Sequence, residues 1–302
     1  MAEVTVRDAR VDDARAIGEV WATALPYLVR SSARAAVDIQ EDATLDRRRS
    51  VGVLDGEVVG TGTARRVADD EVYLSVEVRP DRGSRGVGAA LLRTVVSAFP
   101  DATSLTAVSS DDPIAMAFGI RHGFLPDGEH LISMVAPGSV AKAGRAPEGL
   151  RAVTCDNLPD VQILIDTHNA AANDDPSGLS RQYTWETFHA DWWNSPDNAP
   201  DLSWALLDDV GGTPVVAAFT SMQVDRTRGR AWSAMTATHP SYRGRGMAGW
   251  VKRRALNGLT KAGFAEAWTG NDATNAPMLT VNEALGYRPA ATSIRLLRRL
   301  PR

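Results

Sequence analysis

The sequence predicts an α/β (α+β) fold that occurs twice along the chain. Short runs of alternating or continuous apolar residues, typical of strands, are interspersed with runs in which apolar residues recur at helical spacing. Three pairs of residues also recur at similar offsets: Pro80 and Pro240, and Gly86 and Gly246, are 160 residues apart, and Gly123 and Gly286 are 163 apart. Similar offsets in a matching order of elements indicate a duplicated domain.

Composition narrows the class of protein. With 302 residues, 44% of them hydrophobic, each half is long enough to bury its own core. The formal net charge of −4 argues against a nucleic-acid or membrane partner. Cys155 is the single cysteine, which excludes an internal disulfide and a cysteine-based zinc site. Because no signal peptide or membrane span is recognisable, we expect a cytoplasmic protein.

The first half, residues 1–135, begins with a strand at 4–7 and a helix that Asp12 or Asp13 caps. Asp55-Gly56, between apolar runs at 50–54 and 58–63, predicts a β-hairpin. Further elements follow in order: a strand at 71–78, a helix at 89–99, a strand at 102–109, a helix at 113–121 and a strand at 131–135.

A segment rich in Ala, Gly and Pro at 136–149 predicts an interdomain linker. The second half, residues 150–302, repeats the element order after it. A strand at 150–154 and a helix from 161 lead into a polar insert at 169–200. Strands follow at 204–207, 215–220, 231–238 and 265–269, then a helix at 276–285 and a last strand at 292–297.

The stretch from Thr238 to Ala248 carries the strongest functional signal. It joins a strand-like run to a helix-like run and contains Gly244 and Gly246. Such a loop can turn several backbone N–H groups toward one point, and the helix N-terminus adds partial positive charge, so the junction suits a phosphate or pyrophosphate. It is neither a P-loop nor the dinucleotide-binding motif, because the spacing of both is absent.

This loop resembles the acetyl-CoA loop of the GNAT family of N-acetyltransferases, which reads Arg/Gln-x-x-Gly-x-Gly/Ala. Arg243, Gly246 and Ala248 match it. The family's next conserved block is an Asn followed by a helix that ends in a Gly-Phe-like pair. A similar block is formed here by Asn271, Asn275, Met278 and Asn282, followed by Leu285-Gly286-Tyr287. Together with the repeat, the resemblance covers nearly the whole chain and implies two tandem GNAT domains. Each would be a mostly antiparallel mixed sheet flanked by helices, with acetyl-CoA entering between its fourth and fifth strands.

The two halves match the family unequally. In the first half Gly83 stands at the position of Arg243, with Arg82 beside it, and Asp112 and Gly119 replace polar residues of the second block. We therefore expect the N-terminal domain to be degenerate, with a structural or regulatory role, and the C-terminal domain to be catalytic.

The resemblance implies direct acetyl transfer from acetyl-CoA to a primary amine of a small molecule. The amine must lose a proton before it attacks, since an ammonium has no lone pair. A backbone N–H near the end of strand 231–238 would stabilise the developing oxyanion. The implied acetyl-CoA contacts are Thr236, Ala237, Thr238, Arg243, Gly244, Arg245, Gly246, Met247, Ala248, Asn271, Asn275 and Met278.

Two residues are candidates for the chemical step. Asn282 stands where many family members have a tyrosine that protonates the leaving thiolate, but an amide has no titratable proton. Asn282 could instead bind the thioester or the pantetheine arm. Glu266 could act as the base through water, or it could be a solvated glutamate at a strand end.

The insert supplies candidates for the acceptor site. Asp174 and Asp175 are adjacent carboxylates that would attract a cationic amine, although Asp175-Pro176 also fits a simple turn. Glu186, His189 and Asp191 are weaker candidates. The spacing of His168 and His189 matches no metal site, so we expect no metal. A non-catalytic acyl-CoA-binding sensor is the alternative function, and the acceptor and the oligomeric state stay open.

Overall fold

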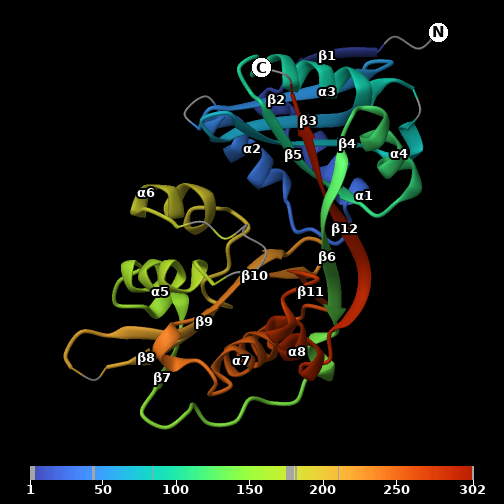
Figure 1. The fold of residues 1–302 in the computed structure, drawn as a ribbon. Coiled ribbons are helices and arrows are strands. Elements are labelled where there is room, and N and C mark those ends of the chain that lie inside the picture. The colour runs from blue at the N-terminus through green and yellow to red at the C-terminus, as the bar shows by residue number, and fades with distance from the viewer. Residues whose placement is uncertain are drawn as a thin grey trace. The chain divides into compact units, whose positions relative to one another are not determined.

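The computed structural model describes residues 4–42, 45–83, 85–174, 180, 182–209 and 211–300. The chain divides into two compact units. Unit 1 consists of residues 1–130 and 291–302, and unit 2 consists of residues 131–290. Each unit has a sheet flanked by helices (Figure 1). Within the described residues, no helix combines the length and apolarity that a membrane crossing needs.

Unit 1 contains a mixed sheet in the order β1-β2-β3-β4-β5-β12. Its pairs are antiparallel except for β4 and β5, which run parallel. The strands are β1 (Val4–Asp8), β2 (Arg47–Leu54), β3 (Glu57–Ala68), β4 (Glu71–Val78), β5 (Ser104–Ser110) and β12 (Arg288–Arg299). The helices are α1 (Ala14–Ala24), α2 (Ser32–Glu41), α3 (Val87–Ser97) and α4 (Pro113–Arg121).

Most elements of unit 1 match the prediction. The β2–β3 hairpin turns at Asp55 and Gly56, which have φ values of 51° and 83°, as a two-residue turn of this kind requires. Helix α2 has no counterpart among the predicted elements, because its alanines and charged residues give only a weak apolar period. Ser31 caps it by accepting a hydrogen bond from the backbone N–H of Arg34.

The strands of unit 2 follow one another in the order β6-β11-β10-β9-β8-β7, and β6 belongs to this unit from residue 131 onward. The strands are β6 (Leu125–Val135), β7 (Arg151–Thr154), β8 (Trp204–Asp208), β9 (Val215–Asp225), β10 (Arg230–Thr238) and β11 (Glu266–Asp272). The helices are α5 (Gln162–Ala172), α6 (Trp185–Phe188), α7 (Met247–Lys261) and α8 (Ala276–Ala284). The described part of the insert at 169–200 thus includes the end of α5, helix α6 and one π-helical turn, His189–Trp193.

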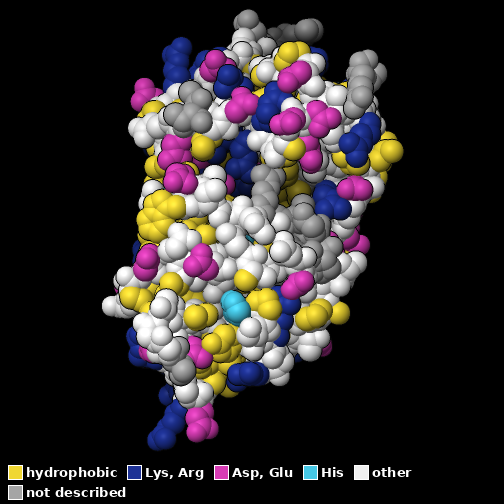
Figure 2. All heavy atoms as spheres, turned by 60° about the vertical axis from the view of Figure 1, so that its left-hand side comes forward, with side chains coloured by type: hydrophobic (Ala, Val, Ile, Leu, Met, Phe, Trp, Pro, Cys, Tyr) yellow, Lys and Arg dark blue, Asp and Glu magenta, His cyan; other side chains and the backbone are white. Residues whose placement is uncertain are grey.

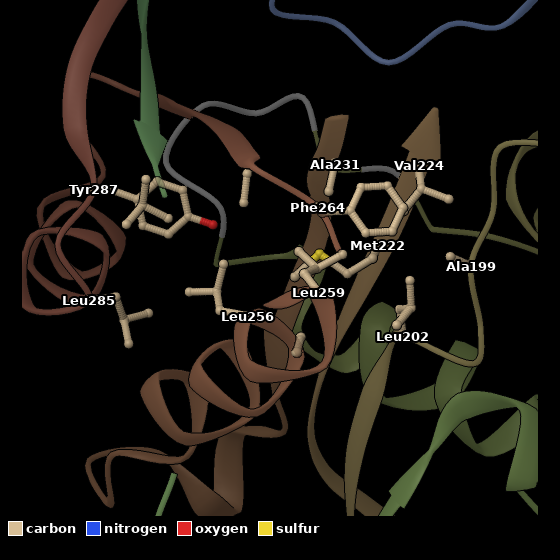
Figure 3. Packing of buried hydrophobic residues seen from close by; sticks show 13 residues of the cluster. Ala199, Leu202, Met222, Val224, Ala231, Leu256, Leu259, Phe264, Leu285 and Tyr287 are labelled. Atoms are coloured by element: carbon tan, nitrogen blue, oxygen red, sulfur yellow. The ribbon is translucent and has the colours of Figure 1, made fainter. Parts of the chain in front are cut away.

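Helices α5 and α7 cover opposite faces of the unit 2 sheet. Helix α5 packs with Phe219, Met235 and Ala237. Helix α7 and the end of α8 pack with Met222 and Ala231 in the cluster shown in Figure 3. Side chains alternate along a strand, so neighbouring residues of β9 and β10 face different helices.

The last strand of the chain belongs to unit 1. From Ser293↔Ser110 to Arg299↔Ser104, β12 pairs antiparallel with β5, and its Leu296 is buried in the unit 1 core. Residues 131–135 of β6 instead belong to unit 2, where Val135 packs with Leu285. This division differs from the predicted boundaries of 1–135 and 150–302, because an apolar pattern predicts a strand but not the edge with which it pairs.

Charged side chains are mixed on the face shown in Figure 2, where Lys and Arg are interspersed with Asp and Glu. Among the residues that the structure describes, that face shows no extended area of one charge.

Candidate functional site

The loop between β10 and α7 has the backbone of an anion-binding turn. Gly244 and Gly246 have φ values of 74° and 72°, which side-chain-bearing residues rarely adopt. Gly246 is the last residue before α7, and apart from Gly246 and its two chain neighbours no heavy atom lies within 4 Å of the point where its Cβ would be. The N–H groups of the first turn of α7 have no acceptor within the helix. A phosphate could therefore approach this backbone closely, favoured by the helix dipole.

Arg243 connects this loop with the insert. Its Nε donates to the carbonyl oxygen of Thr238 over 3.4 Å, and its Nη1 donates to a carboxylate oxygen of Asp174. The side chains of Arg243 and Asp174 are 41% and 57% exposed. The structure thus brings together two residues for which the sequence predicts different roles. Asp175 lies outside the described residues.

The other polar groups of the loop point to a well-ordered turn. The guanidinium of Arg245 lies 5.6 Å from the ring centre of Tyr242. The Tyr242 hydroxyl donates to Asp208 Oδ2 over 2.7 Å, which anchors the loop to β8. Met247 is buried against the sheet, so its side chain serves packing.

Beyond their first three paired positions β10 and β11 no longer pair with each other, and we call this unpaired stretch the gap between the two strands. The two strands pair in parallel from Arg230↔Glu266 to Trp232↔Trp268. A β-bulge between Ser233 and Met235 follows in β10. The end of β10, with Thr236, Ala237 and Thr238, continues to pair with β9. A gap beside an open strand edge, leading to a glycine loop at a helix N-terminus, fits the pantetheine and pyrophosphate of acetyl-CoA.

The predicted second block forms a small amide network. Asn282, 3% exposed, donates from Nδ2 to Asn271 Oδ1 over 2.6 Å. Its own Oδ1 is buried without a partner among the described residues. Asn275 Oδ1 accepts from the backbone N–H of Met278 over 3.2 Å and so caps α8. Asn271 and Asn282 therefore lie together on the α8 side of β11.

Glu266 is not brought together with these residues. Its Oε2 accepts hydrogen bonds of 3.0 Å from Arg230 Nε and Trp268 Nε1. It lies at the start of β11, where the strands are paired, whereas Asn271 lies near the other end. At about 3.3 Å per strand residue, the end of β11 is roughly 20 Å away. The carboxylate is thus occupied and lies away from Asn271 and Asn282.

The described part of the insert beyond Asp174 includes an aromatic cluster next to α5. The Trp185 and His189 rings pack at a tilt of 34° with centres 3.9 Å apart, and His189 Nδ1 donates to the carbonyl oxygen of Trp185. The His168 ring packs against Tyr183 at 5.1 Å. The pKa of Glu186 is lowered, first by a hydrogen bond from its own backbone N–H. Packing explains these residues without a ligand.

Lys252 of α7 is a buried cation that the sequence motifs do not predict. It is 1% exposed, its Nζ donates to Ser233 Oγ over 3.0 Å, and it lies 5.3 Å from the ring centre of Tyr287. Burial lowers its pKa to about 7. The burial of Lys252 could have been predicted from the sequence, because Lys252 lies between Val251 and Leu256 on the apolar side of α7.

The matching loop of unit 1 has a different charge arrangement. Gly86, with φ 85°, precedes α3 as Gly246 precedes α7. Arg82 already pairs with Glu57 at 3.1 Å and with Asp81 at 3.5 Å. Asp112 caps α4 by accepting from the N–H groups of Ile114 and Ala115. The backbone of the loop is thus kept, whereas its nearby arginine is neutralised by the protein's own carboxylates.

Unit 1 also has a buried carboxylate on β4. Glu77, 6% exposed, lies 3.9 Å from Arg30, and burial raises its pKa. Both Glu77 and Ala237 stand three residues before the proline of their loop, so unit 2 has no acid at this position.

Comparisons with known proteins agree with the fold. Residues 16–124 match the model of the acetyltransferase (GNAT) family. A solved tandem GNAT protein from the clavulanic acid biosynthesis pathway is 20% identical, with a TM-score of 0.74 and coverage of 99% of this chain and 100% of that one. A GCN5-related N-acetyltransferase from Sphaerobacter thermophilus is 17% identical, with a TM-score of 0.71 and coverage of 98% and 95%.

A third solved structure, a GCN5-related N-acetyltransferase from Kribbella flavida, is 19% identical, with a TM-score of 0.54 and coverage of 89% and 96%. A comparison with curated proteins gave no match. The family model matches the first half, so the match does not identify the half that binds acetyl-CoA.

Proposed function

We propose that the chain is a tandem protein of the GNAT acetyltransferase family whose unit 2 transfers acetyl from acetyl-CoA to a primary amine of a small molecule. The observation that carries this proposal is the β10–α7 junction. It combines two left-handed glycines, an exposed arginine and the N-terminus of a 15-residue helix beside a gap between strands. In unit 1 the equivalent arginine is missing.

Different residues of unit 2 would bind different parts of acetyl-CoA. The N–H groups at Gly246, Met247 and Ala248 would hold the pyrophosphate, with Arg243 supplying positive charge. The open edge of β10 at Thr236 and Thr238 would pair with the pantetheine amides. Arg245 would add charge at the solvent side.

The chemistry needs a neutral amine and a place for negative charge. When bound, acetyl-CoA supplies the acetyl group and a thiol leaving group. The backbone N–H groups at the end of β10 are fixed dipoles, which favour negative charge beside them without reorganisation. Asn282 and Asn271, linked by a hydrogen bond, would orient the cosubstrate. Since Glu266 is paired with Arg230, we leave it out of this mechanism and assign deprotonation of the amine to solvent.

The acceptor would enter from the α5 side, opposite α7. Asp174 lies just after the end of α5 there, and an aspartate beside the loop would attract a cationic amine. Replacing Asp174 and Asp175 with Asn should raise the acceptor KM.

A non-catalytic acyl-CoA sensor is the second candidate, favoured by the amide of Asn282 at the position of the tyrosine. Thiol release from acetyl-CoA across a panel of primary amines separates the two. An acetyltransferase releases thiol with at least one amine and yields an acetylated product by mass spectrometry, and Gly246→Val lowers both at limiting acetyl-CoA. Binding of acetyl-CoA without release for any amine would favour the sensor.

A further inference from the structure

A chain of hydroxyl groups leads from the buried Lys252 to the gap between β10 and β11. Lys252 Nζ donates to Ser233 Oγ over 3.0 Å. Ser233 Oγ lies 3.4 Å from Thr220 Oγ1, which lies 2.9 Å from Thr236 Oγ1. Either hydroxyl of each of the last two pairs can be the donor. Thr220 and Ser233 are buried, whereas Thr236 is partly exposed on the strand that borders the gap.

We propose that Lys252 supplies the proton for the departing thiolate through the hydroxyl groups of Ser233, Thr220 and Thr236. This inference rests on the proposed function of unit 2. It provides the proton donor that Asn282 cannot provide, because an amide has no titratable proton. Lys252 acts through the hydroxyl chain and does not itself touch the reacting atoms.

The proton balance closes. The ammonium of Lys252 gives one N–H proton to Ser233, Ser233 gives its O–H proton to Thr220, and Thr220 gives its proton to Thr236. Thr236 gives its proton to the sulfur, so a thiol leaves as the C–S bond breaks. Lys252 is then neutral, and the same chain returns a proton to it from water at Thr236. The protons of the amine go to solvent.

The hydroxyl chain lies on the side of the sheet opposite the proposed amine entrance. This position suits a proton donor for the leaving thiolate. Phe219, Met235 and Ala237 face α5, the side from which we propose that the amine arrives. Thr220 and Thr236 alternate with these residues, so they face α7, which carries Lys252. Helix α8, with Asn282, lies on this same side, where Gly249 of α7 meets Val281.

The first unit has no counterpart of this chain. Lys252 is six residues after Gly246, and Leu92 is six residues after Gly86. Thr220 pairs with Thr236 across β9 and β10, whereas Gly62 pairs with Val76 at the equivalent place across β3 and β4. Leu92 is a core residue there. The duplicated fold therefore does not require polar groups at these positions, and their presence in unit 2 needs a separate reason.

The surroundings of Lys252 suit a proton donor near neutral pH. Among the described residues, Tyr287 is the titratable group that faces its ammonium, and the pKa of that phenol is raised by burial. Burial is also the cause that lowers the pKa of Lys252 to about 7. The ammonium is thus acidic enough to give up a proton and basic enough to regain it.

The test compares variants that keep or remove one hydroxyl. Thr220→Val preserves shape and removes the hydroxyl, Thr220→Ser keeps it, and Thr269→Val is the matched control. Thr269 is also buried next to Ser233, but its hydroxyl donates to the backbone oxygen of Ser233. It is therefore not part of the hydroxyl chain between Lys252 and Thr236. With acetyl-CoA and the panel of primary amines, Thr220→Val should lower kcat at least tenfold and lose the basic limb that begins near pH 7. Thr220→Ser and Thr269→Val should keep the wild-type kcat and the basic limb of its pH profile.

A second readout needs no turnover. The chain has three lysines, Lys142, Lys252 and Lys261, so ¹³C-lysine NMR with Lys252→Met as the assignment control can follow Lys252 alone. Its signal should titrate near pH 7 in wild type and in Thr220→Val. Titration near pH 10, or equal kcat profiles for Thr220→Val and Thr220→Ser, would overturn the inference and leave the proposed function standing. Wild type that releases no thiol with any amine would overturn both.

Discussion

Asp174, just after α5, accepts a hydrogen bond from Arg243 in the loop before α7. The guanidinium that we assign to the pyrophosphate is therefore held by a carboxylate from the proposed acceptor wall. Both side chains are exposed by more than a third, so solvent screens the pair and limits its worth to about 1 kcal/mol. An anion at the loop would compete with Asp174 for Arg243.

Asp174→Asn should therefore strengthen acetyl-CoA binding by up to about fivefold, which corresponds to about 1 kcal/mol. The gain should shrink at high salt, because the competing charges are exposed. Calorimetric titration at low and high ionic strength measures it. Weaker binding by the variant would mean that Asp174 orients Arg243 for the phosphate instead.

Lys252 should make stability depend on pH. Its pKa falls from 10.5 in the unfolded chain to about 7 in the folded protein. The charged form is thus disfavoured by folding, and the cost is complete below pH 7 and declines as pH rises toward 10.5. At about 1.4 kcal/mol per pKa unit, its upper limit is about 5 kcal/mol.

Lys252→Met should accordingly raise the free energy of unfolding by several kcal/mol at pH 6, and by much less at pH 9.5. Urea unfolding of both proteins across this range measures the difference. The raised pKa of Tyr287 acts only at higher pH. A variant that is less stable than wild type at pH 6 would contradict the burial of an uncompensated ammonium.

Leu296 tests the placement of the last strand. Its side chain, 4% exposed, lies in the unit 1 core, and its Cδ1 is close to Gly119. Leu296→Ala should lower the stability of unit 1 by about 2–5 kcal/mol, as for other buried leucines. Hydrogen exchange should speed up in β4 and β5, whereas Leu297→Ala, at a less buried position, should cost less. Faster exchange confined to unit 2 would contradict the pairing of β12 with β5.

Local order was predictable from sequence to a large extent. The Asp55-Gly56 hairpin, the proline-headed helices α4 and α8, and the glycine junction before α7 each depend on chemistry within a few residues, and all are present. Partners distant in sequence were not predictable. Nothing near Leu296 specifies β5 as its neighbour, and the Arg243–Asp174 pair joins residues 69 positions apart. The hydroxyl chain from Lys252 to Thr236 was not predictable either, because it depends on which residues of β9 and β10 face α7.

Asn282 should have a modest role in turnover. Asn282→Ala removes the hydrogen bond to Asn271 and leaves the Lys252 chain intact, so kcat should fall less than tenfold and keep its pH profile. Steady-state kinetics across pH check this once an acceptor is found. Complete loss of activity with unchanged acetyl-CoA affinity would show that Asn282 takes part in the chemical step.

The most direct test of the central claim is calorimetric titration of the full chain with acetyl-CoA. Gly246→Val and Gly86→Val are a matched pair, since both glycines have positive φ, precede a helix and have open space at the Cβ position. We predict one strong site per chain, weakened at least tenfold by Gly246→Val and little changed by Gly86→Val. Two equal sites, or a single site lost in Gly86→Val and kept in Gly246→Val, would contradict the assignment of acetyl-CoA to unit 2.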